Sequence, residues 1–80
     1  MDFKILGKII QTRTFAIGRS VREFDYLNRI YGTGNWQKRK GIATVKFENG
    51  ETRLAELHWC EDIDIGRKEF KIKQFLDYRD

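Results

Sequence analysis

The sequence contains very little that could stabilise or anchor a small protein apart from its own core. One of its 80 residues is cysteine and none is proline. A single cysteine excludes an intramolecular disulfide framework and indicates a reducing compartment. No apolar stretch approaches the roughly 18 residues that a membrane span requires, and no secretory leader is recognisable. We therefore expect a cytoplasmic protein that has no membrane partner and no covalent cross-links.

The length predicts a single domain, residues 1–80. A domain of this size buries only about 60% of the surface that its unfolded chain exposes, so its stability is marginal. Hydrophobic residues nevertheless make up 40% of the sequence and include six Phe, three Tyr and two Trp. That content is sufficient for a core, and disorder is not expected.

The positive charge is concentrated in the first part of the chain. Residues 1–46 contain ten Lys or Arg and three Asp or Glu, a net charge of +7, whereas residues 47–80 contain six and nine, a net charge of −3. A chain polarised in this way can attract a polyanion to one region and repel it from another. The charge alone is equally compatible with simple solvation of a small domain.

Hydrophobic periodicity predicts an α+β fold. In this fold, one amphipathic helix packs on an antiparallel sheet of three to five strands with a C-terminal meander. Alternation of apolar and polar residues predicts strands over residues 42–48, 51–60 and 67–75. Residues 3–17 are also typical of β structure, as one long bent strand or as two strands.

A capping box predicts where the helix begins. Ser20 and Glu23 are three residues apart, so the hydroxyl of the first can reach forward to a backbone amide while the carboxylate of the second reaches back. Apolar residues then recur at helical spacing, and Gly32 is a natural C-cap. We predict an amphipathic helix of about three turns between these residues.

An Asn-Gly dipeptide at residues 49–50 predicts a hairpin, and the register of that hairpin decides the surroundings of the only histidine. With a two-residue loop both faces of the hairpin are mixed, and Glu56 and His58 point together into a partly enclosed site. A bulge or a longer loop instead returns Leu57 and Trp59 to the core and turns Glu56 and His58 to solvent. The sequence leaves both registers open.

His58, Glu56 and Arg67 are the candidate catalytic residues. An imidazole, a carboxylate and a cation suit the cleavage of a phosphodiester that has a neighbouring 2′-hydroxyl. A lone histidine on a strand is also often structural, so a structural role stays open for His58. One histidine, one cysteine and scattered acids do not make a convincing metal site, and we expect no metal and no other cofactor. Cys60 is interpreted as a buried structural thiol.

Trp36 and the basic run that follows it are the clearest signal for binding. A flat aromatic side chain beside a cluster of cations suits single-stranded nucleic acid, which uses the ring for stacking and the cations for backbone contact. Trp36 also suits the small core, in which case the cations alone remain available for phosphates. The candidate nucleic-acid-binding residues are Trp36, Lys38, Arg39, Lys40, Lys68, Lys71 and Lys73.

The segments 55–61 and 65–73 resemble the C-terminal part of small uncharacterised bacterial domains, some of which sit at the ends of toxin-module proteins. The expected layout, a helix followed by an antiparallel meander, is also similar to the compact ribonuclease fold of RelE-like toxins. The resemblance implies cleavage of RNA without a metal, with Glu56 or His58 as base or acid. The phosphate would be held by four cations: Arg39, Arg67, Lys68 and Lys71.

The sequence thus favours a small basic cytoplasmic domain that binds RNA or acts on it. If it is an enzyme, we expect a metal-independent ribonuclease of the toxin type. One alternative is a non-catalytic protein-interaction module, such as an inhibitor, an antitoxin-like partner or a homodimer. The acidic segment 61–64 and the small size favour it. Another is an SH3-like barrel that binds nucleic acid without cleaving it.

Overall fold

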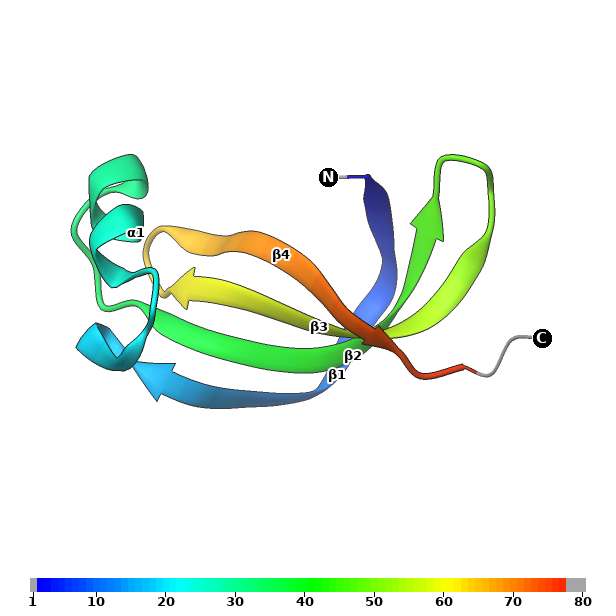
Figure 1. The fold of residues 1–80 in the computed structure, drawn as a ribbon, viewed down its shortest axis with the longest axis horizontal. Coiled ribbons are helices and arrows are strands. Elements are labelled where there is room, and N and C mark those ends of the chain that lie inside the picture. Colours follow the sequence, from blue (N-terminus) through cyan, green and yellow to red (C-terminus); the bar gives the residue numbers. More distant parts are fainter. Residues whose placement is uncertain (1, 78–80) are drawn as a thin grey trace.

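Four antiparallel strands form one sheet in the order β1-β2-β3-β4 (Figure 1). The computed structural model describes residues 2–77. Each strand pairs with the next one in sequence, so the whole sheet is a meander. The elements are β1 (Phe3–Ile17), a 3₁₀ turn (Gly18–Ser20), α1 (Phe24–Tyr31), β2 (Gln37–Phe47), β3 (Thr52–Asp62) and β4 (Gly66–Phe75).

The predicted α+β class is wrong, because the helix contributes little to the fold. Strands hold 62% of the described residues and helices 14%, so the class is largely β. The strands are longer than alternation indicates, since β2 begins at Gln37 and β3 continues to Asp62. One helix and a four-stranded antiparallel sheet are nevertheless present. Within residues 2–77 we find no helix that could span a membrane.

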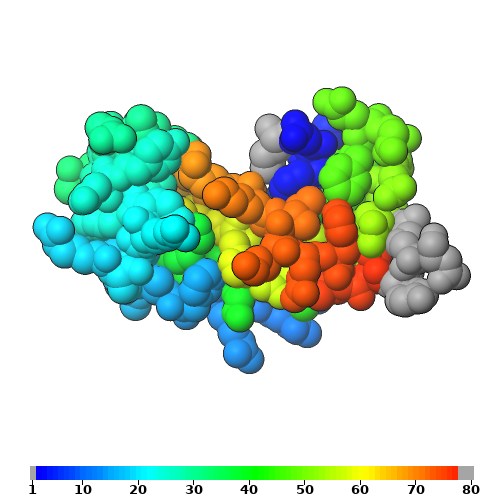
Figure 2. All heavy atoms as spheres, in the orientation of Figure 1, coloured from blue at the N-terminus to red at the C-terminus, as the bar shows by residue number. Residues whose placement is uncertain are grey.

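The long, bent strands make the molecule elongated. Its extents are 42 × 22 × 19 Å and its radius of gyration is 13.6 Å, whereas a compact domain of this length is expected to have a radius of gyration of about 12 Å. The helix lies at one end, and the start of β1 and the β2–β3 hairpin rise at the other. Figure 2 shows these ends as two bulky parts with the middle of the sheet between them.

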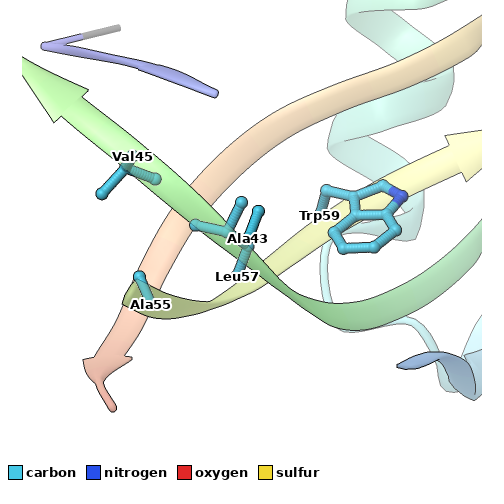
Figure 3. Packing of buried hydrophobic residues seen from close by; sticks show 5 residues of the cluster. All are labelled: Ala43, Val45, Ala55, Leu57 and Trp59. Atoms are coloured by element: carbon cyan, nitrogen blue, oxygen red, sulfur yellow. The ribbon is translucent and has the colours of Figure 1, made fainter. Parts of the chain in front are cut away.

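One face of the sheet carries the larger core, and we call it the inner face. Alternate residues of the two central strands point to it, and Figure 3 shows five that are buried: Ala43, Val45, Ala55, Leu57 and Trp59. Apolar residues of both edge strands pack on them, among them Ile5 and Ile9 of β1 and Phe70 and Ile72 of β4. All four strands therefore contribute to this core.

The helix covers only one end of the opposite face, which we call the outer face. At that end Trp36 and Cys60 are fully buried in a second cluster with Leu27 of α1. Side chains alternate along β3, and its pairing with β2 is regular, so Cys60 lies on the same face as His58 and Glu56. The outer face beyond the helix therefore carries Glu56 and His58 without a covering element.

The predicted capping box does not form. Ser20 closes the 3₁₀ turn instead: its hydroxyl donates to the carbonyl of Ile17 over 2.6 Å and accepts from the amide of Ile17 over 2.9 Å. Glu23 is the N-cap residue of α1, but its carboxylate accepts a hydrogen bond from the ammonium of Lys38 at 3.2 Å. The helix begins at Phe24 and has eight residues, fewer than the three turns expected.

The β2–β3 hairpin has a three-residue loop, residues 48–50, rather than a two-residue loop. Gly50 has a φ of 88° there, in the left-handed region that this turn requires and that glycine adopts without strain. The extra loop residue shifts the pairing by one position along the hairpin. Leu57 and Trp59 consequently return to the core, as the longer-loop alternative predicts.

β1 is one long strand with several bulges. It has 15 residues against 11 in β2, and the register shifts after Leu6, Ile10 and Thr14. Gly7 and Gln11 have positive φ values of 70° and 52° at these irregularities. Bulges increase twist, bend the strand and redirect side chains. These shifts change which residues of β1 point to each face of the sheet.

Asp62 holds the connection between α1 and β2. Its Oδ2 accepts the amide of Asn35 over 2.7 Å, and its Oδ1 accepts the amides of Asp64 and Ile65 over 2.8 and 2.9 Å. These backbone hydrogen bonds, that of Ile65 foremost, hold the pKa of Asp62 below its ordinary value. Part of the acidic segment thus has a structural role, and the turn between β3 and β4 begins only after Asp62.

β1 closely approaches the backbone of β2 at Gly41. A Cβ atom at this position would lie 2.6 Å from Cγ2 of Ile9 and 3.1 Å from the carbonyl oxygen of Ile10. Real Cβ atoms essentially never lie as close to another heavy atom as the 2.6 Å to Ile9. The bulged part of β1 can therefore pack closely on β2 because Gly41 has no side chain.

We expect Gly41→Ala to lower the free energy of unfolding by about 1–3 kcal/mol, the usual cost of overpacking a close contact. Urea unfolding followed by circular dichroism measures the change. Lys46→Ala, at an exposed position of the same strand, is the control and should change stability by less than about 0.5 kcal/mol. Equal stability of Gly41→Ala and the wild-type protein would show that β1 can move away from β2 without loss.

Candidate functional site

Glu56 and His58 form a hydrogen-bonded pair on the open part of the outer face. They are two residues apart on β3, so both side chains point to the same face. Nε2 of His58 lies 2.7 Å from Oε2 of Glu56. The exposed fractions of the two side chains are 20% and 21%. The pair is therefore held in place and can still be reached from solvent.

Strand β4 holds Glu56 on its other side. Gln74 faces Glu56 across the β3–β4 pairing, and its Nε2 donates to Oε1 of Glu56 over 2.9 Å. The hydrogen bond from Gln74, followed by the one from His58, holds the pKa of Glu56 below its ordinary value. The carboxylate is therefore ionised at neutral pH, and both of its oxygens have partners.

The carboxylate determines which ring nitrogen of His58 is free. An ionised carboxylate can only accept a hydrogen bond, so the N–H of the His58 ring is at Nε2 and donates a hydrogen bond to Oε2 of Glu56. Nδ1 is then the acceptor nitrogen, and it has no hydrogen-bond partner among residues 2–77. A carboxylate that fixes an imidazole in this way leaves its other nitrogen able to accept or deliver a proton.

Three cations border the pair. Lys40 faces His58 from β2 and Lys71 faces it from β4, while Arg13 of β1 is paired with Lys40. Arg13, Lys40 and Glu56 line a shallow hollow of about 180 Å³. As far as the structure describes the chain, none of the three cations forms an ion pair. They are free to bind an anionic ligand beside His58.

An exposed aromatic ring completes the surroundings of the pair. The ring centroid of Phe15, on β1, lies 5.1 Å from that of His58. Nζ of Lys40 lies 5.9 Å from the same Phe15 centroid. Almost half of Phe15, 49%, is exposed to solvent. The Glu56–His58 pair is thus bordered by free cations and by one accessible aromatic surface.

Arg67 lies on the inner face with Arg39, away from the Glu56–His58 pair. Nε of Arg67 lies 3.3 Å from Oε1 of Glu61, and Nη1 of Arg39 lies 3.5 Å from Oε2. The indole of Trp59 donates to the same carboxylate over 2.9 Å. Burial raises the pKa of Glu61, but the hydrogen bond from Trp59 and the two arginine charges outweigh it, so the pKa is lowered. The geometry therefore lends no support to the catalytic role predicted for Arg67.

Lys38 has a structural environment at the helix end. Its ammonium lies 3.2 Å from Oε2 of Glu23 and 3.6 Å from Sγ of Cys60, and 14% of its side chain is exposed. Burial raises the pKa of the Cys60 thiol. A protonated buried thiol is a poor nucleophile, which agrees with the interpretation of Cys60 as structural. Lys38 forms an ion pair with Glu23 and is therefore not available to bind a phosphate.

Trp36 is not available to stack on a base. It is fully buried, and its ring contacts that of Tyr31, so the interpretation of Trp36 as a core residue is the correct one.

The remaining predicted lysines differ in their surroundings. Nζ of Lys68 lies 5.4 Å from the ring centroid of Tyr31. The hydrogen bond from Tyr31 to Glu69 raises the pKa of Tyr31 to about 12. Lys73 is exposed on β4 at a bulge. Of the predicted binding residues, Lys40 and Lys71 lie beside the pair.

Phe15, Arg13 and Gln74 lie at the site but were not predicted from the sequence. Alternation within residues 3–17 places Arg13 and Phe15 on one face, and this signal could have marked them as a unit. The alternation could not have shown that Arg13 and Phe15 lie on the same face as His58, because the bulges in β1 change its phase. Gln74 was hidden in the same way by the register shifts of β4.

Comparison of the chain with protein-family models, with curated proteins and with solved structures gives no match. The resemblance to toxin-module domains therefore stays an expectation. Within residues 2–77, no three His, Cys, Asp or Glu side chains gather as a metal ion would require. The geometry around Glu56 and His58 is the basis on which a function can be proposed.

We expect Gln74→Ala to raise the pKa of Glu56 toward its ordinary value, because the substitution removes the hydrogen bond that lowers this pKa most. A carbon NMR titration of the Glu56 carboxyl group measures the shift. A lowered folded-state pKa stabilises the protein above the ordinary pKa, and this contribution is lost as the pH falls. Gln74→Ala should therefore lose less stability on acidification than the wild-type protein does.

Gln37→Ala is the control for this experiment, because it removes a glutamine that contacts Thr14 rather than the pair. Its Glu56 titration should match that of the wild-type protein. A Glu56 titration that stays unchanged in Gln74→Ala would show that β4 does not hold the carboxylate in solution.

Proposed function

We propose that the protein binds RNA on the open part of its outer face and cleaves it at the Glu56–His58 pair without a metal ion. The observation that carries this proposal is the 2.7 Å contact between Nε2 of His58 and the ionised carboxylate of Glu56. The pair is accessible and is bordered by Lys40, Lys71 and Arg13. RNA carries its own nucleophile, the 2′-hydroxyl, so the protein has to supply proton transfer and positive charge.

The reaction requires one proton acceptor with a fixed orientation. Nδ1 of His58 takes the proton from the 2′-hydroxyl, the 2′-oxygen forms a bond to phosphorus, and the bond from phosphorus to the 5′-oxygen breaks. The leaving 5′-oxygen takes a proton from water, and the proton on His58 returns to solvent. The products are a 2′,3′-cyclic phosphate and a 5′-hydroxyl group. Glu56 is a positioning residue, because it keeps the other proton on Nε2.

The cations supply the second requirement. Negative charge on the phosphate oxygens increases as the 2′-oxygen attacks, and fixed cations near that position stabilise the transition state. Lys40 and Arg13 line the hollow beside Glu56, and Lys71 stands across β3 from Lys40. Their charges are not neutralised by ion pairs of the described chain, in contrast to those of Arg39 and Arg67.

Wild-type protein incubated with total RNA in EDTA is expected to cleave it and to leave 2′,3′-cyclic phosphate ends. His58→Ala should lower the cleavage rate at least about 100-fold, because removal of a general base typically lowers rates by 10²- to 10⁴-fold. Arg29→Ala is the control, since it removes one exposed cation from the helix. Intact RNA after incubation with the wild-type protein, or equal cleavage by His58→Ala, would contradict catalysis at the pair.

A protein-interaction role is the second candidate, and apolar residues of the same outer face favour it. Leu6, Ile10 and Leu54 are exposed by 40%, 53% and 40%. Leu6 and Leu54 both pair with Thr44, so they occupy neighbouring positions across three strands. The two functions differ in their response to salt: affinity for RNA falls steeply as salt rises, whereas association through apolar surface does not.

A further inference from the structure

Phe15 is an aromatic residue in an unusual position. Three aromatic residues between positions 2 and 77 are exposed: Phe15, Tyr26 and Phe75. Tyr26 lies on the helix, and the ring of Phe75 is covered by the guanidinium of Arg53 at 4.1 Å. Phe15 is the one whose ring contacts His58. An accessible aromatic surface thus stands directly beside the proposed catalytic residue.

The backbone of β1 places Phe15 there. The β1–β2 register shifts between Thr14 and Ala16, so Phe15 is the residue without a pairing partner in β2. Bulges of this kind redirect side chains and are frequent next to functional sites. The core does not cover the ring of Phe15, because 49% of the residue is exposed.

The positive charges around the ring are complementary to the negative charge of a nucleotide. Nζ of Lys40 lies 5.9 Å from the Phe15 ring centroid, and Arg13 precedes Phe15 by two residues on the same strand. A base stacked on the ring would therefore have its phosphate within reach of these two cations. This combination of an aromatic surface and flanking cations is typical of proteins that bind single-stranded nucleic acid.

We infer that the substrate is single-stranded RNA and that Phe15 stacks on a base next to the cleaved phosphate. The inference rests on the proposed function and names its substrate class. Bases within a duplex are stacked on one another and offer no free face, so stacking on Phe15 selects unpaired RNA. Phe15 thereby has the role that the sequence analysis predicted for Trp36, which is buried.

Binding of a fluorescently labelled, 2′-O-methylated RNA oligonucleotide tests the inference, because RNA without a 2′-hydroxyl cannot be cleaved. Wild-type protein should bind the single strand more tightly than the same sequence in a duplex. Phe15→Leu, which keeps an apolar side chain but removes the ring, should weaken single-strand binding about 5- to 150-fold, the effect expected for one stacked base. Phe15→Trp should retain the binding.

Salt dependence separates stacking from charge. Phe15→Leu should leave the slope of affinity against salt unchanged, because no phosphate contact is lost. Lys40→Ala should lower that slope by about one, as expected for one phosphate contact. Tyr26→Leu is the matched control, because it removes an exposed aromatic ring from the helix, and it should bind like the wild-type protein.

Phe15→Trp also reports on the contact directly. The two native tryptophans are fully buried, so RNA that stacks on the new indole should quench its fluorescence selectively, and this readout requires a folded protein. Three results would each overturn the inference. Phe15→Leu could bind the single strand as tightly as the wild-type protein does, or it could lose single-strand and duplex binding equally. RNA could also leave the indole fluorescence of Phe15→Trp unquenched. If the wild-type protein cleaves RNA in that case and His58→Ala does not, the proposed function stands without the stacking role of Phe15. Intact RNA with the wild-type protein, or equal cleavage by His58→Ala, would instead contradict the proposed function itself.

Discussion

The alternation of side chains along β3 is the constraint on which the rest of the molecule depends. Leu57 and Trp59 are buried on the inner face, and burial of an apolar side chain of this size contributes roughly 1.5–3 kcal/mol. The residues between and beside them, Glu56 and His58, are therefore turned to the outer face. A slip of one residue would exchange the two sets and remove the core. The three-residue loop at residues 48–50 sets the register that satisfies this requirement.

The position of the short helix decides which part of the outer face is free. α1 covers the end at Trp36 and Cys60, and there Lys38 is paired with Glu23. Lys40 lies two residues further along the same strand, beyond the helix, and has no such partner among the described residues. Neighbouring lysines of one basic run thus have different roles because one is covered and the other is open.

Sequence reasoning predicted the three C-terminal strands, left residues 3–17 open as one strand or two, and brought Glu56 and His58 together. These results follow from a pattern that repeats every two residues. It overestimated the helix, because a capping box is a local pattern and Glu23 has a stronger partner in Lys38. It also grouped Arg67 with His58, because Arg67 begins the predicted strand that adjoins β3. The pairing of Arg67 with Glu61 instead assigns it to the opposite face.

Local pattern was sufficient to place Glu56 and His58 on one face, because alternation within a single strand holds in either hairpin register. Their surroundings required the folded molecule. Phe15 and Gln74 come from the two outer strands, whose bulges shift the register by amounts that alternation does not contain. The burial of Trp36 depends on where α1 docks. These features arise from contacts between segments that are far apart in the chain. Such contacts form only when the whole chain folds, so no local sequence pattern contains them.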